Sequence, residues 1–253
     1  MLAEEDKLFK MVSKEILKEL SRIYLETQKD VLKELLAIQA INKATNSTAI
    51  SRELLLADTL TRINKSIQIM ADNSNNLLTA NLIDTYTRTY TTVSETLKKL
   101  GALTTDIIPA DVEDIIKQPW SGVSFSENIW YNRDVLIHKA KDTISKGLIR
   151  GNSPHEMATE LSKTMGSSYN NARRLVETEI SAAQTRANID NYKNNGIDKV
   201  EISAILDTKA CKTCKQHDSN IVLVEKGILG KDLPPFHPNC RCTTIPVVDI
   251  PED

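Results

Sequence analysis

Two short motifs near the carboxyl end place soft metal ligands at the same spacing. Cys211 and Cys214 form a C-x-x-C pair, and His237 and Cys240 repeat that spacing with an imidazole in place of the first thiolate. This spacing lets two side chains of a tight turn face one ion, and three cysteines with one histidine form a common ligand set for structural zinc. The two pairs therefore predict a tetrahedral zinc site, or a site for another soft transition metal.

The sequence does not decide which residue is the fourth ligand of this site. Cys242 follows Cys240 after one residue, so a set of four cysteines with Cys242 in place of His237 is an alternative. Either closed set leaves no position for a substrate water, which indicates a structural metal. Disulfide pairing is a further alternative, but the acidic, amphipathic start of the chain is unlike a secretory signal, and a reducing compartment favours metal binding.

Familiar catalytic motifs are missing from the sequence. It contains no Walker loop, no dinucleotide-binding G-x-G-x-x-G and no zinc-protease H-E-x-x-H, and Ala210 stands where the zinc deaminase pattern requires proline before the first cysteine. His217 and Asp218 follow the first cysteine pair without an evident orienting partner, so we interpret them as a polar loop. We expect no enzymatic turnover.

One helical segment, residues 171–192, offers an enzymatic alternative, a nuclease or an ADP-ribosyltransferase-like site. Its residues would be Arg173 or Arg174, Thr178, Glu179 and Arg186. Glu179 and Arg186 lie seven residues apart and so share a helix face. A buried ion-pair network that holds this helix against a sheet explains the same residues without catalysis, and it is the interpretation we favour.

Composition and charge restrict the partners. The chain has 253 residues and a formal net charge of −2, so no overall field attracts it to nucleic acid or to an anionic membrane. No apolar run is long enough to span a bilayer, and we interpret the chain as a cytosolic product. A local, sequence-neutral and salt-sensitive DNA contact remains an alternative, through Lys209, Lys212, Lys215 and Arg241.

The first hundred residues predict long helices. Glycine and proline are absent before Gly101, and aromatic residues make up 4% of the chain, which suits helices packed through leucine and isoleucine. The segments "NKATNSTAIS" and "ADNSNN" are polar enough for turns, so we expect three or four helices here. Two apolar stripes mark their buried faces: Phe9, Val12, Ile16, Leu20, Ile23, Val31, Leu35 and Ile38, then Leu56, Leu60, Ile63, Ile67 and Met70.

The second half changes from helix to strand. After a boundary near Pro109 and Pro119, residues 129–148 read as a helix, and Ser153 with Glu156 forms a capping box that begins another. A helix over 170–194 ends before Gly196. The alternating segment 199–204 and the runs "NIVLVE" and "TTIPVV" predict a small antiparallel sheet that carries the cysteines. The predicted fold is mainly α, with long N-terminal helices and a small C-terminal α+β domain, in which helices pack on the sheet and its metal knuckle.

From Trp120 to Pro246 the chain resembles the phage Mu F-like minor head proteins, also called head morphogenesis proteins of tailed phages. The segments that carry the resemblance are, in order, "WSGVSFSENI", "KGLIRGNSPHEMATELSK", "ARRLVETEISAAQTRA", C-x-x-C and "PPFHPNCRC". The family often has glycine after the aspartate at the place of Asp218, and this chain has Ser219 there. The resemblance divides the chain into a helical N-terminal region, 1–110, and a Mu F-like minor head domain, 111–253.

The resemblance also implies a function. It implies a minor structural protein of a phage or prophage head, without established enzymatic turnover, that acts in capsid assembly or in DNA packaging and delivery. The implied partners are the portal protein and the major capsid or scaffold protein, with no membrane contact. The protein would be part of the virion after assembly in the cytoplasm of the bacterial host.

Overall fold

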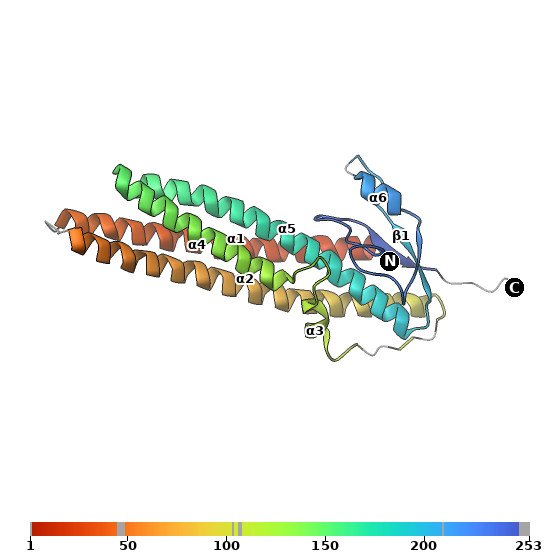
Figure 1. Ribbon diagram of the computed structural model, residues 1–253. Helices are drawn as coiled ribbons and strands as arrows, with labels where there is room; N and C mark the ends of the chain where they lie inside the picture. Colours follow the sequence, from red (N-terminus) through yellow and green to blue (C-terminus); the bar gives the residue numbers. More distant parts are fainter. Residues whose placement is uncertain (1, 45–48, 103, 106–107, 209, 248–253) are drawn as a thin grey trace. The chain divides into compact units, whose positions relative to one another are not determined.

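The computed structural model describes residues 2–44, 49–102, 104–105, 108–208 and 210–247. Its main elements are four long helices, α1 (Leu2–Ala44), α2 (Ala49–Lys99), α4 (Phe125–Arg150) and α5 (Pro154–Asn194). Two short helices, α3 (Val112–Lys117) and α6 (Lys212–His217), lie in the connections, as Figure 1 shows. The predicted predominance of helix is confirmed.

The expectation of three or four helices before Gly101 is wrong, because the described residues there form only α1 and α2. The segment "ADNSNN", predicted to be a turn, lies inside α2. Ser74 in this segment is buried and its hydroxyl donates to the Met70 carbonyl of the preceding turn at 2.7 Å, while Ala71 and Leu78 keep the apolar period. Local polarity therefore did not break a helix whose buried face continues. Between α1 and α2, residues 45–48 of the other predicted turn lie outside the described residues.

The predicted apolar stripe of α1 is a buried face. Val12, Ile16, Leu20 and Ile23 are each at most 7% exposed, and Phe9 is half-buried. The side chain of Ile38 lies outside the described residues. Because this stripe is already covered within the protein, it offers little apolar surface to a partner.

The chain forms two compact units that interleave along the sequence. The first comprises Met1–Ile16, Leu78–Phe125 and Arg174–Asp253, and the second comprises Leu17–Leu77 and Ser126–Arg173. Each unit draws on both sides of residue 110, where the sequence predicted a division into two regions. That division of the chain remains a prediction.

The second unit is built from segments of the four long helices. The rings of Tyr24 on α1 and Tyr169 on α5 meet edge to face with centroids 5.5 Å apart. Where α4 approaches α5, a Cβ on Gly147 would lie 2.6 Å from the Met157 side chain, so a larger residue there would displace Met157. The predicted capping box is present at the start of α5, where the Glu156 amide donates to the Ser153 hydroxyl at 3.3 Å and the Ser153 amide donates to the Glu156 carboxylate at 2.7 Å.

The first unit contains the predicted antiparallel sheet. After α5 the chain turns through Gly196, whose φ is +71°, into β1 (Lys199–Ser203), and β2 (Ile221–Leu223) and β3 (Thr243–Pro246) flank this central strand. Val200 of β1 pairs with Val222 of β2, and Ile202 pairs with Thr244 of β3. The alternation of β1 points Val200 and Ile202 inward.

The inner face of the sheet packs on two helices. Its core cluster joins Val200 and Ile202 to Val93 and Leu97 of α2, to Tyr192 of α5 and to the buried Cys214, Cys240 and Cys242. The hydroxyl of Tyr192 donates to the Thr244 carbonyl at 3.4 Å. The sheet is therefore an extension of the helical core, and the cysteines form part of that core.

Candidate metal centre

The first ligand pair is held at the start of α6. Cys211 is the N-cap residue of this helix, and its sulfur accepts the amide hydrogen of Cys214 at 3.3 Å. Cys214 is buried in the first helical turn, so both sulfurs lie on the same side of the turn. The C-x-x-C spacing is thus the spacing of a helix N-terminus.

The second pair comes from the loop that enters β3. The Cys240 amide donates to the His237 carbonyl at 3.1 Å, and Asn239 between them has a left-handed φ of +60°. This tight turn points the imidazole of His237 and the sulfur of Cys240 toward α6. Cys242 follows directly before β3.

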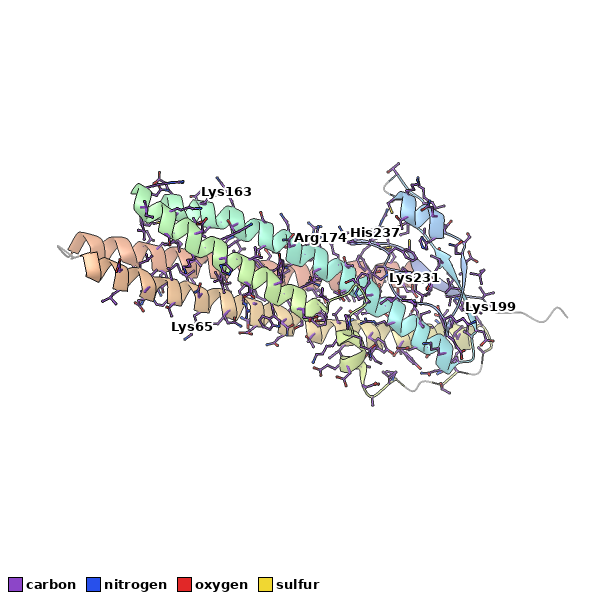
Figure 2. All side chains as sticks on the ribbon, viewed as in Figure 1. Lys65, Lys163, Arg174, Lys199, Lys231 and His237 are labelled. Atoms are coloured by element: carbon purple, nitrogen blue, oxygen red, sulfur yellow. The ribbon has the colours of Figure 1, made fainter. Side chains whose placement is uncertain are left out.

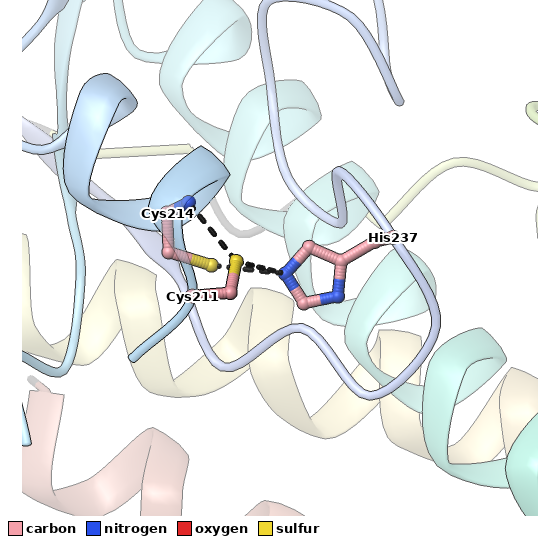
Figure 3. Close-up of side chains that lie close together, drawn as sticks. All are labelled: Cys211, Cys214 and His237. Atoms are coloured by element: carbon pink, nitrogen blue, oxygen red, sulfur yellow. Dashed lines mark hydrogen bonds between the residues drawn. The ribbon is translucent and has the colours of Figure 1, made fainter. Parts of the chain in front are cut away.

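The five predicted ligands come together in two overlapping groups. The Nε2 atom of His237 lies 3.1 Å from the Cys211 sulfur and 3.0 Å from the Cys214 sulfur, as Figure 3 shows. Cys214, Cys240 and Cys242 form the second group, and within each group the ligand atoms lie within 4.8 Å of one another. Cys214 belongs to both groups and lies 3.9 Å from Cys240, sulfur to sulfur.

These separations suit a tetrahedral ion. Bonds of about 2.3 Å to sulfur and 2.0 Å to nitrogen put two sulfurs about 3.8 Å apart and a sulfur and nitrogen about 3.5 Å apart. The sulfur separation of 3.9 Å between Cys214 and Cys240 agrees, and the imidazole lies about 0.5 Å closer to its sulfurs, as in a thiol–imidazole hydrogen bond. With its proton on Nδ1, His237 donates to the Pro238 carbonyl at 2.8 Å, which leaves the Nε2 lone pair for a metal.

The electrostatics of the thiols fit a site for a cation. A hydrogen bond from Cys242 is the main cause that lowers the pKa of Cys240 to about 5, and the same contact raises the pKa of Cys242. Burial raises the pKa of Cys214 to about 12, whereas the amide of Cys214 lowers the pKa of Cys211 to about 7. The protein alone therefore stabilises some thiolates at the expense of others. A bound cation would stabilise all of them together, because metal binding requires thiolate ligands.

The neighbours of the centre hold its two loops in place. Arg241 makes two hydrogen bonds to the Asp207 carboxylate at 2.8 and 2.7 Å. Asp218 accepts the Ala204 amide at 2.8 Å, and the ring of His217 stacks on Phe236 with centroids 3.9 Å apart. His217 and Asp218, which we interpreted from the sequence as a polar loop, therefore stabilise this region, His217 through ring stacking and Asp218 through a hydrogen bond.

The basic residues of the predicted DNA contact differ in exposure and pairing. Lys212 and Lys215 are exposed on α6, while Arg241 is already paired with Asp207. Lys209 lies outside the described residues. The two lysines alone are a small charged surface, and the DNA contact remains a prediction.

Glu179 and Arg186, two residues of the enzymatic alternative, lie in the first unit and form hydrogen bonds to the segment before α4 instead of the predicted ion pairs to the sheet. Glu179 is 4% exposed and accepts the indole N–H of Trp120 at 3.1 and 3.2 Å, and burial raises its pKa to about 7. Arg186 donates to the carbonyls of Ile116 at 3.0 Å and Gln118 at 2.5 Å. Both residues therefore hold α5 to the 116–120 segment rather than to the sheet.

The other residues of the enzymatic alternative are Thr178, which is buried, and Arg173 and Arg174, which are exposed. The Thr178 hydroxyl accepts the Asn239 amide at 3.1 Å, a contact with the turn between His237 and Cys240 that could not be predicted from the sequence. Arg173 and Arg174 are exposed on α5, and Figure 2 labels Arg174.

Comparison with known proteins finds one family description that matches part of the chain. Residues 138–245 match the family described as "Phage Mu protein F like protein". The match begins in α4 and includes α5, the three strands up to Ile245 and every candidate ligand. No solved structure matches the chain.

A curated relative carries a different kind of name. It is the NAD(+)–arginine ADP-ribosyltransferase EFV of Enterococcus faecalis, 28% identical over 168 residues. The alignment covers 58% of this chain and 34% of the relative, so the chain spans about a third of that protein. The family match over residues 138–245 confirms the resemblance to the phage Mu F-like proteins, and this family supports a phage head morphogenesis protein.

Proposed function

We propose that this chain is a minor structural protein of a tailed phage or prophage head, associated with the portal vertex and acting in capsid assembly or DNA delivery. The observation that carries the proposal is the family match over residues 138–245. The grouped cysteines and histidine can surround an ion completely, which suits a structural site.

Zinc is the metal that we propose for this site. Thiolate and imidazole ligands favour zinc over hard cations, and Cys211, Cys214, His237 and Cys240 would complete its shell, with Cys242 as the alternative to His237. The ion would join α6 to the loop that enters β3. Since both segments contribute to one core cluster, the metal would stabilise the whole end of the sheet.

The metal proposal is tested by elemental analysis of the reduced, purified protein. We expect about one zinc per chain, with loss of zinc in Cys214→Ser, because Cys214 belongs to both ligand groups. Thr213→Ser, an exposed change on the same helix, is the matched control and should keep its zinc. A reduced wild-type protein without bound metal would refute the proposal.

The fourth ligand is tested by cobalt substitution. The thiolate-to-cobalt absorption grows with the number of cobalt–sulfur bonds. A site with His237 should keep its intensity in Cys242→Ser and lose affinity in His237→Ala, whereas a four-cysteine site should show the reverse.

The proposed location in the phage head is tested with purified heads. We expect the chain in purified, DNA-filled heads and in complexes with the portal protein, and we expect assembly or DNA delivery to fail without it. Cross-linking to the portal, capsid and scaffold proteins identifies the partner. Heads that lack the chain, while infection depends on it, would contradict a structural role.

A second candidate function follows from the name of the enterococcal relative, NAD(+)–arginine ADP-ribosyltransferase. Glu179, the glutamate of the enzymatic alternative, is 4% exposed and accepts the indole N–H of Trp120. NAD cleavage by the purified chain tests this candidate. A turnover that disappears in a folded Glu179→Gln variant would favour the enzyme over the structural protein.

A further inference from the structure

The outer face of the small sheet in the first unit stays open to solvent in the part of the chain that the structure describes. On β2, Ile221 is 55% exposed and Leu223 is 42% exposed. Their cross-strand partners on β1 are Glu201 and Lys199, and residues paired across neighbouring strands share a face of the sheet. Ile245 of β3, which is half-buried, pairs with Glu201 from the other side. The face therefore combines apolar edges with a charged central strand.

The two charges of the central strand are available to a partner. Lys199, which Figure 2 labels, is exposed, and Glu201 is half-buried. Neither side chain makes an ion pair or a hydrogen bond with the described residues. They lie two residues apart on one strand and so about 7 Å apart along it. A partner that packs on this face must present an anion opposite Lys199 and a cation opposite Glu201, because like charges repel across an interface.

A second copy of this chain presents that pattern. Two copies can face each other across a two-fold axis that crosses the strands between Lys199 and Glu201, and Lys199 of each copy then lies opposite Glu201 of the other. The same rotation places Ile221 opposite Leu223, so apolar side chains meet apolar side chains at the edge. An axis parallel to the strands would place like charges together. The face is therefore complementary to itself in one orientation.

We propose that two copies of this chain pair through the outer faces of their sheets, with two ion pairs between Lys199 and Glu201 at the centre of the interface. Sheets pack face to face about 10 Å apart through apolar side chains, which Ile221, Leu223 and Ile245 supply. The ion pairs set the orientation of the two copies more than the strength of their binding. This inference goes beyond the proposed function, because it uses neither the family match nor the metal ligands.

The size of the face determines the strength of this association. The three strands contain five, three and four residues, and neighbouring strands lie about 4.8 Å apart, so the face is about 14 Å wide. Such a face buries far less than the roughly 800 Å² per partner that stable interfaces bury. We therefore expect a weak dimer, with a dissociation constant on the order of 100 µM.

The test measures the mass of the full, reduced chain by sedimentation equilibrium between about 10 µM and about 1 mM, a range that brackets this dissociation constant. We expect the wild type to change from monomer to dimer across the range. Lys199→Glu and Glu201→Lys should each weaken self-association at least tenfold, because each places like charges opposite each other. Lys65→Glu, an exposed change of the same charge on α2, is the control and should dimerise like the wild type. Circular dichroism checks that the variants are folded.

Two combinations of these variants distinguish a specific pairing from a general loss of folding or solubility. The double variant Lys199→Glu/Glu201→Lys restores the complementary pattern and should dimerise again. An equimolar mixture of the two single variants should form a heterodimer, because each charge of one chain then faces the opposite charge of the other. Ile221→Ser should weaken the dimer at least threefold, whereas Ile228→Ser, an exposed change outside the strands, should leave it unchanged.

Three results would each overturn the proposal: a wild type that stays monomeric throughout the range, a dimer that survives Lys199→Glu, or a double variant and a mixture that do not associate. Residues 248–253, which follow β3 in the sequence and lie outside the described residues, are the competing occupant of the face. If the wild type is monomeric and only a chain that ends at Val247 dimerises, the C-terminal segment covers the face in place of a second copy.

Discussion

Glu179 makes the stability of the protein depend on pH in a specific direction. Its carboxyl is buried against Trp120, and burial raises the pKa from 4.5 to about 7. Between these two values the unfolded chain releases the proton and the folded chain retains it. The free energy of unfolding should therefore fall as the pH rises from about 4.5 to about 7, and it should stay level, for this group, above that range.

The size of this fall follows from the two pKa values. Each pKa unit corresponds to about 1.4 kcal/mol, so the rise from 4.5 to about 7 amounts to about 3 kcal/mol at alkaline pH. Glu179→Gln removes the ionisation while it keeps the size of the side chain. Relative to the wild type, the variant should gain about 3 kcal/mol on going from pH 4.5 to pH 8, whatever constant amount its altered hydrogen bonds cost.

Urea unfolding of both proteins at several pH values, with zinc and reductant held constant, measures this relative change. Using the difference between the two proteins removes the pH dependence of metal binding, which both share. Glu15→Gln, an exposed change on α1, should follow the wild type at every pH. A Glu179→Gln curve parallel to that of the wild type would mean that Glu179 is hydrated or paired in the folded protein, and the reasoning from burial would be wrong.

Three further changes test separate parts of the fold. Ser153→Ala removes the capping box of α5 and should cost about 1 kcal/mol of stability, measured by urea unfolding. Gly230→Ala should destabilise by about 1 to 3 kcal/mol in the same assay, because the residue has φ +84° and a Cβ there would lie 3.1 Å from Trp120. Chelation of metal from the wild type should lower the melting temperature by at least several degrees, whereas chelator should leave Cys214→Ser unchanged; equal effects on both would speak against a metal at this site.

The long helices were predictable because their signals extend over many residues. The absence of glycine and proline before Gly101 and the apolar stripes required extended helices, and α1 and α2 follow them. The number of helices was not predictable from "ADNSNN", because Ser74 satisfies its hydroxyl within the helix while Leu78 continues the buried face. A short polar segment gives a weaker signal than the periodicity around it.

The grouping of the five candidate ligands was predictable from the sequence, and their binding of a metal stays a prediction. Cysteines and a histidine at these spacings leave few chemical alternatives, and the structure brings all five side chains into two overlapping groups. The buried contact beside them, in which Glu5 accepts a hydrogen bond from Thr243 across 238 positions of the sequence, was not predictable. Nothing in the local pattern around Glu5 distinguishes it from the exposed acids of the same helix, because only tertiary packing buries it.

Two adjacent residues of α5 connect the loop of the second ligand pair with the segment that precedes α4. Thr178 accepts the amide of Asn239, the left-handed residue between His237 and Cys240, so it fixes the turn that presents the second ligand pair. Glu179 accepts the indole of Trp120, whose ring in turn lies against Gly230 in the segment between β2 and the ligands. One turn of helix thus contacts both the turn between His237 and Cys240 and the segment that precedes α4.

A change at Thr178 should therefore weaken metal binding although Thr178 is not a ligand. Thr178→Val keeps the shape of the side chain and removes the acceptor for Asn239, so we expect a several-fold higher zinc dissociation constant in a chelator competition assay. Thr159→Val, on the exposed face of the same helix, is the control. Equal zinc affinity in the two variants would show that the Asn239 turn forms independently of α5.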